Sequence, residues 1–350
     1  MEICNACRYC EGFCAVFPAM ELRRSFTDPD LTYVANLCHN CQGCYYACQY
    51  APPHEFGINL PRTFAELRAE TYAEFAWPRS LARLFARNGL IVSLIAALIT
   101  AVVLLLASLL QTPEAMTAVR PAQPGSFYAV IPLWVMVIAG LATFGFALFA
   151  LAASLRRFWQ EAAPAHGLGA AAIARSLGDL LTLRYLGGGG HGCNDRDESF
   201  SMTRRWLHHA MFYGLLLCFA ATIVGFIYQD FLGWAAPYPL LSIPVCLGTL
   251  GGLALLSGTV GLFALKLTAD RDLTPVHLLG ADVALLLLLA LAAATGLVLL
   301  ALRTTSAMGM ALAIHLGVVL ALFLVLPYSK FVHTIYRAAA LLRFAAERHG

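Results

Sequence analysis

The chain alternates long apolar stretches with shorter polar segments from about residue 90 to its end. A helix needs about 20 residues to cross the roughly 30 Å hydrocarbon core of a bilayer, and six stretches reach that length. They are Leu90 to Leu110, Tyr128 to Leu151, Trp206 to Gln229, Ile243 to Leu265, Val276 to Leu302 and Met308 to Phe331. Residues 89–350 are therefore expected to form a six-helix transmembrane bundle with a long polar loop at 156–205.

Composition and charge support this topology. The chain is 60% hydrophobic and only 12% charged, so a soluble domain could not bury its apolar surface. Of its 23 lysines and arginines, only Arg120 and Arg303 lie on the opposite side of the six spans from residues 1–88. The positive-inside rule then predicts a multi-pass protein of the bacterial inner membrane with both termini cytoplasmic. The net charge of +3 is small, and we expect no nucleic-acid partner.

Eight of the eleven cysteines fall in the first 48 residues, where the pattern C-x2-C-x2-C-x3-C occurs twice. In two-cluster ferredoxins, the fourth cysteine of each such run ligates the other cluster. The spacing predicts one [4Fe-4S] cluster on Cys4, Cys7, Cys10 and Cys48, and a second on Cys38, Cys41, Cys44 and Cys14. Zinc is the alternative, but zinc sites combine two separate C-x2-C pairs, whereas a tight run of four occurs twice here.

The predicted fold class is all-α. The stretch Ala15 to Leu37, between the two cysteine runs, lacks the alternation of a hairpin and reads as helical. Residues 1–88 are thus expected to form a cytoplasmic, α-helical ferredoxin-like domain, followed by the membrane domain at 89–350. Only three residues precede Cys4, so no signal peptide is expected before it.

Histidines inside the predicted spans are candidate cofactor ligands, because ionisable groups are costly in hydrocarbon. Ligation of haem by two histidines requires facing helices and similar depth, and His209 and His333 meet that test. We expect them to hold one haem b, with Lys330 available to a propionate. His315 lies 18 residues before His333, five turns along one helix face and about 27 Å away. It is either a ligand with an unidentified partner or part of a quinol site.

Other polar positions leave two interpretations open. His208 and His277 fit a structural role and a functional role equally well. Asp282 fits a proton relay or a pairing with a nearby cation. The glycine-rich segment Gly187 to Cys193 is expected to be a flexible linker, although its glycines would also permit close approach to a partner.

The segment Ile3 to Cys14, the second cysteine run and the six spans resemble the tricarballylate- or citrate-utilisation protein B family over nearly the whole chain. Members usually carry more residues before the first cysteine, so the resemblance leaves open whether Met1 is the true start. The segment Leu326 to His333 is similar to the haem-bearing helix of the nitrate reductase gamma subunit. That resemblance implies that His333 is the cytoplasmic-side ligand and His209 its partner, while Phe219 departs from the pattern for an outer haem. The heterodisulfide reductase membrane subunit looks like a more distant relative.

The resemblance implies a role as an oxidoreductase component in electron transfer. A partner FAD-dependent dehydrogenase would oxidise a tricarballylate- or citrate-type substrate, and this chain would pass the electrons through its clusters and haem b to membrane quinone. The chain itself shows no dinucleotide-binding fingerprint, so substrate choice would reside in the partner. The alternatives are a tricarboxylate transporter, a redox sensor with an iron–sulfur regulatory domain, and a role in cofactor biosynthesis. The sequence shows no inverted repeat of the kind found in many transporters, which argues against the transporter alternative.

Overall fold

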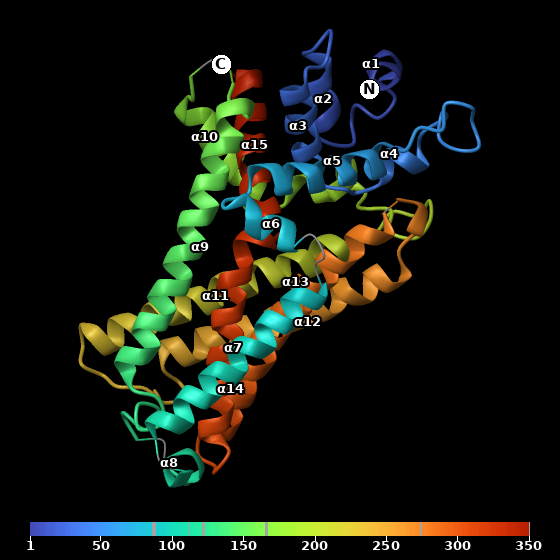
Figure 1. Ribbon diagram of the computed structural model, residues 1–350. Coiled ribbons are helices and arrows are strands. Elements are labelled where there is room, and N and C mark those ends of the chain that lie inside the picture. The colour runs from blue at the N-terminus through green and yellow to red at the C-terminus, as the bar shows by residue number, and fades with distance from the viewer. Residues whose placement is uncertain (86–88, 112, 121–122, 165–166, 274, 350) are drawn as a thin grey trace.

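The computed structural model describes residues 1–350 except 86–88, 112, 121–122, 165–166, 274 and 350. Within these residues every regular element is a helix. An isolated antiparallel β-bridge pairs Cys193 with Ser201. The prediction of an all-α fold is confirmed. Figure 1 shows the cysteine-bearing domain and both termini gathered at one end of a long helical bundle.

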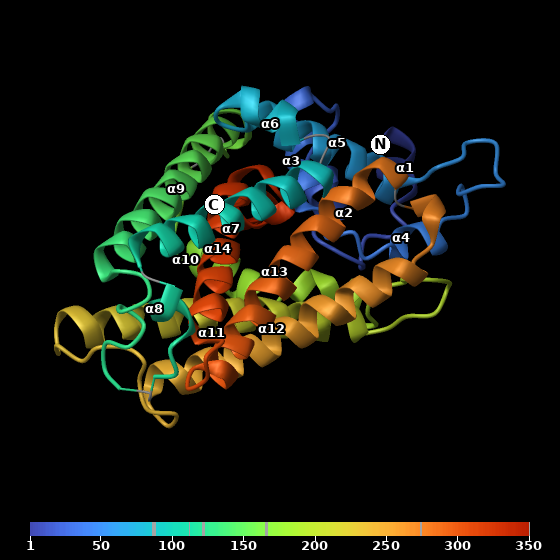
Figure 2. The same cartoon turned by 60° about the horizontal axis from the view of Figure 1, so that its bottom comes forward.

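Six helices of the described chain are long and apolar enough to cross a membrane, as expected for a multi-pass membrane protein. They are α7 (Gly89–Leu110), α9 (Leu133–Ala162), α11 (Thr203–Asp230), α12 (Ile243–Thr268), α13 (Val276–Leu302) and α14 (Met308–Val325). The short α8 (Pro113–Thr117) lies at the end away from the cysteines (Figure 1). Figure 2 shows the turn between α12 and α13 beside α4, where Tyr46 donates a 2.9 Å hydrogen bond to Asp270.

Glycines bring α11 and α12 into backbone contact. A Cβ atom at Gly214 would collide with the backbone nitrogen of Leu255, and one at Gly258 would collide with that of Met211. Small residues at such positions let membrane helices pack closely without a hydrophobic driving force between them. This close packing fixes the position of α11, which carries His208 and His209.

The sixth span does not continue as one helix to His333. α14 ends at Val325 and is followed by two 3₁₀ turns, η3 (Leu326–Tyr328) and η4 (Lys330–Val332), before α15 (His333–His349) begins. Pro327 lacks an amide hydrogen and clashes with a preceding carbonyl in a helix, and Ser329 is extended with ψ 174°. The expectation that His315 and His333 share one helix face is therefore wrong.

The cysteine-bearing domain consists of short helices connected by turns. They are α1 (Glu2–Cys7), α2 (Val16–Glu21), α3 (Asp28–Leu37), α4 (Gly43–Tyr46), α5 (Leu60–Phe75) and α6 (Arg79–Phe85). The helical prediction for residues 15–37 is confirmed by α2 and α3. The hydrophobic core of the domain includes Tyr33 and Val34 of α3, and it extends to Leu341 and Phe344 of α15. The C-terminal helix is thus part of the N-terminal domain's core, and α10 (Ala170–Leu181) also packs on α15.

A largely buried ionic network ties α15 to this domain. Asp30 accepts from Arg23 at 2.8 Å and from Arg343 at 3.1 Å, while Glu347 accepts from Arg343 at 2.8 Å. Arg23 also pairs with Glu347, and the Arg343 guanidinium lies 4.2 Å from the centre of the Tyr33 ring. Because every charge has an opposite partner, the network can be buried without leaving an isolated ion.

We predict that Arg343→Met loosens this contact. Asp30 and Glu347 would keep Arg23 but lose the second cation, so amide hydrogen exchange in α3 and α15 should accelerate by about tenfold or more. Hydrogen–deuterium exchange of the detergent-solubilised protein measures this. The exposed pair of Arg62 and Glu66 provides the control, because exposed pairs contribute little and Arg62→Met should leave the exchange unchanged. Equal protection in both variants would contradict the role given to the network.

Candidate iron–sulfur and haem sites

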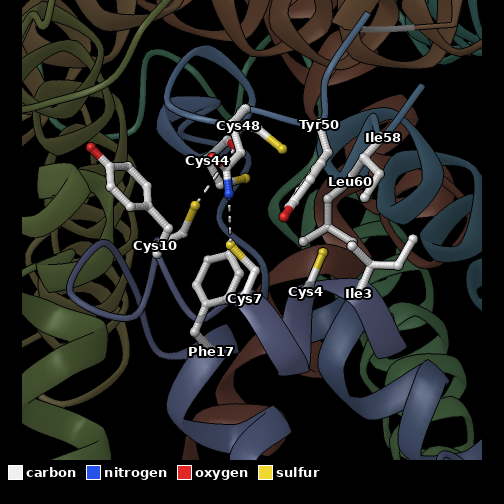
Figure 3. A pocket seen from close by; sticks show the side chains of 12 residues that line it. Ile3, Cys4, Cys7, Cys10, Phe17, Cys44, Cys48, Tyr50, Ile58 and Leu60 are labelled. Carbon is white, nitrogen blue, oxygen red and sulfur yellow. Dashed lines mark hydrogen bonds between the residues drawn. The ribbon is translucent and has the colours of Figure 1, made fainter. Parts of the chain in front are cut away.

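The first cysteine set lies around one cavity at the end of α1. Cys4, Cys7, Cys10 and Cys48 all line it, and Cys44 borders it as well (Figure 3). α1 ends at Arg8, whose left-handed conformation (φ 56°) turns the chain between Cys7 and Cys10. The fold thus places the last cysteine of the second run beside the first three of the first run.

The second set lies around a neighbouring cavity. Cys14, Cys38, Cys41 and Cys44 line it together with Phe13, Phe17 and Phe64. Cys44 borders both cavities, and its carbonyl oxygen lies 3.9 Å from the Cys10 Sγ. The structure therefore brings the eight thiols together in the two crossed groups that the spacing predicts.

The electrostatics of these thiols favour a positively charged occupant. Burial, followed by the proximity of Cys48 and Cys4, raises the pKa of the Cys10 thiol to about 12. Burial and the neighbouring Cys41 and Cys38 thiols also raise the pKa of Cys44 well above its usual value. Four thiolates in such a site repel one another unless a metal centre compensates them.

Among the described residues, the thiols are not arranged around a single point, as a zinc ion requires. A zinc ion needs four donors at about 2.0–2.3 Å from one point. Among the described residues, no three cysteine, histidine or acidic side chains are arranged to hold a single ion.

The glycine-rich segment packs against the cysteines, so the expectation of a flexible linker is wrong. It forms the turn η1 (Arg184–Gly190), in which Gly189 has φ +76°. A Cβ atom there would lie 2.9 Å from the Gly12 carbonyl oxygen, next to the first cysteine run. The backbone amide of Asn194 donates to the Cys41 carbonyl at 2.9 Å. The Arg204 guanidinium donates to the Asn40 carbonyl at 2.6 Å. This part of the chain therefore packs against both cysteine runs.

The structure brings His208, and not His209, to His333. The ring centres of His208 and His333 are 6.2 Å apart, close to the separation of about 6 Å for two imidazoles whose nitrogens each lie about 2 Å from one metal. His209 stacks on Tyr213 at 5.9 Å, because consecutive helical residues point about 100° apart. His333 Nδ1 contacts the Lys330 carbonyl, which leaves Nε2 available to a metal. The geometry therefore favours His208 over His209 as the partner of His333.

The buried Arg68 and the partly buried Arg337 stand beside this histidine pair, and sequence reasoning missed both arginines. Arg337 donates to the Cys38 carbonyl at 2.9 Å, and Arg68 donates to the same oxygen at 3.3 Å. Among the described residues, neither arginine forms an ion pair with a carboxylate. The Nε atom of Arg337 also has no hydrogen-bond partner among these residues. Burial lowers the pKa of Arg337 to about 10. Guanidiniums that lack a carboxylate partner suit an anionic group such as a haem propionate, so the residues present fit haem b.

The remaining candidates occupy other positions. Asp282 forms ion pairs with both Lys266 and Lys330, as the expectation of a nearby cation required. Lys330, expected beside a propionate, thus already has a carboxylate partner. His315 lies deeper in the bundle, where its Nδ1 is 3.1 Å from the Thr295 hydroxyl. Phe219 packs against Phe144 and Phe323. The side chain of His277 lies outside the part that the structure describes.

Two family models match successive parts of the chain. Residues 84–350 match the family model described as citrate utilization protein B, and residues 1–74 match that of its Fer4-like domain. The chain is 48% identical over 349 residues to the citrate utilization protein B of Escherichia coli, covering 99% of this chain and 91% of that protein. No solved structure matches.

Gly189→Ala is predicted to lower the iron and acid-labile sulfide content of the purified protein. The new methyl group would collide with the Gly12 carbonyl and displace the first cysteine run, which should reduce metal affinity by about tenfold or more. Gly190→Ala is the matched control, because Gly190 also has a positive φ (+110°) but its Cβ would meet no atom within 4 Å. A full iron content in Gly189→Ala would show that the loop does not support the site.

Proposed function

Since the chain belongs to the citrate utilization protein B family, we propose that it carries electrons from a flavoprotein dehydrogenase to membrane quinone. Two [4Fe-4S] clusters and one haem b, when bound, supply one-electron carriers between a two-electron flavin and a two-electron quinone. The overall reaction balances as reduced flavin plus quinone giving oxidised flavin plus quinol. Substrate oxidation belongs to the partner.

The observation that carries this proposal is the continuity between the two candidate sites. Cys38 belongs to the second cysteine group, and its carbonyl accepts from Arg337. Arg337 follows His333 by four residues on α15, so the two side chains share one helix face. One helix thus connects the ligands of the cluster domain to the histidine pair at the bundle.

The chain's own residues have separate tasks in this proposal. The two crossed cysteine groups hold the clusters, while His208 and His333 ligate haem iron. Arg337 and Arg68 would pair with its propionates. Phe17, a buried side chain in the wall of the first cavity, limits the access of water to it, since solvent exposure alters cluster potential.

The entry point for electrons is proposed to be the first cavity. Tyr9 and Ile3 line it and remain 71% and 36% exposed, and the nearby Phe56 is 52% exposed. Exposed aromatic and aliphatic residues grouped at one place favour a protein partner. We propose that an FAD-dependent dehydrogenase for a tricarballylate- or citrate-type substrate docks here, on the cytoplasmic side of the bacterial inner membrane, where both termini lie.

The test is quinone reduction by proteoliposomes that contain ubiquinone-10 and receive reduced flavin mononucleotide from outside. Wild type should reduce the quinone well above the rate of protein-free liposomes. Cys48→Ser should slow it by about tenfold or more, because it removes a cluster ligand. Cys246→Ser, in α12 and away from both cysteine groups, is the control and should match wild type. A wild-type rate equal to that of empty liposomes would overturn the proposal, and citrate uptake in its place would support a transporter.

A further inference from the structure

A large apolar cavity lies between α11, α12, α13 and α14, in the half of the bundle away from the cysteines. Its volume is about 290 Å³, and it is partly open to the bundle surface. Leucine, alanine, glycine and phenylalanine side chains form most of its wall, and Phe219 and Phe323 flank it. Sites for small molecules occupy about 300–1,000 Å³, so this cavity suits a compact headgroup of one or two rings.

His315 is the imidazole in this wall, and the fold makes room for it. A Cβ atom at Gly296 would lie 3.0 Å from the His315 Cε1, so a larger residue there would press on the ring. Ionisable residues inside membrane spans are functional candidates by default, because burying them is costly without a purpose or a partner. Thr222 and Thr249 add hydroxyl groups to the same wall.

The hydrogen bonds of Thr295 define which nitrogen of His315 faces a ligand. The Thr295 hydroxyl lies 2.7 Å from the Leu291 carbonyl, which can only accept, so its single proton points there. The same oxygen, 3.1 Å from His315 Nδ1, must then accept from Nδ1–H. The neutral imidazole has one proton, so Nε2 keeps a free lone pair.

The cavity lies within reach of the proposed haem ligands. Leu215 in its wall follows His208 by seven residues on α11, which corresponds to about 10 Å of helix rise. No second imidazole lines the cavity, since Cys218 is the other wall residue with a metal-binding side chain among those described. A haem with two histidine ligands, as proposed at His208 and His333, therefore cannot form here.

We propose that this cavity binds the headgroup of a prenylated quinone, with His315 Nε2 accepting a hydrogen bond from a quinol hydroxyl group. The prenyl tail extends through the open side of the cavity into the lipid. The inference rests on the proposed function and locates its electron acceptor, in the half of the membrane opposite to the clusters.

The experiment is photoaffinity labelling of the whole protein in proteoliposomes with an azido-ubiquinone analogue, followed by peptide mapping. Labelling is expected on the wall segments of α11, α13 and α14. Ala292→Phe should reduce it by about tenfold by filling the cavity, and His315→Leu should reduce it by about fivefold to tenfold through loss of one hydrogen bond. Leu291→Phe is the matched control, because this neighbouring side chain is 50% exposed and lies outside the wall.

The outcomes separate the inference from the proposed function. Labelling elsewhere, or equal labelling in all variants, would overturn the cavity as the quinone site, even if flavin-driven quinone reduction proceeds. Labelling that follows the variants while quinone reduction is absent would support the site and overturn the proposed function. A loss of haem from His315→Leu, measured by pyridine haemochrome, would assign the cavity to haem and overturn the inference.

Discussion

The attachment of α15 to the cysteine-bearing domain is the interaction on which the rest of the arrangement depends. Arg343 and Glu347 join the network around Asp30, and Leu341 and Phe344 complete the domain's apolar core. The same helix begins at His333, beside the bundle, and carries Arg337 between the two. The position of the cysteine groups relative to the histidine pair is therefore set by one helix, α15, and not by a flexible linker.

Two features of the bundle place the opposing histidine. Backbone contact at Gly214 and Gly258 holds α11 against α12, which fixes the depth and rotation of His208. The interruption at Pro327 and Ser329 redirects the chain between α14 and α15. Without that break, His333 would follow the direction of α14 and Arg337 would move away from Cys38. A local loss of helical hydrogen bonds thus permits a contact between distant parts of the sequence.

The sequence predicted the features that depend on local spacing, namely six apolar spans, an all-α fold and two cysteine runs. Those features are visible because thiolate spacing and helix length are local constraints. The choice between His208 and His209 was missed, since both lie at the same depth and only helix rotation in the packed bundle separates them. Arg68 and Arg337 were missed because both side chains reach the Cys38 carbonyl from distant segments, and no pattern in either segment reveals that contact. The glycine segment carried a signal, since a run of four glycines also permits close backbone approach, as found at Gly12.

The most direct test is the dithionite-reduced-minus-oxidised visible spectrum of the purified protein and three alanine variants. The account predicts a sharp b-type haem band in wild type and in His209→Ala, and its loss in His208→Ala and His333→Ala. His209 is the matched control, because it adjoins His208 in sequence but faces Tyr213. Absence of the band from wild type, or its loss in His209→Ala with retention in His208→Ala, would contradict the assignment of the haem ligands.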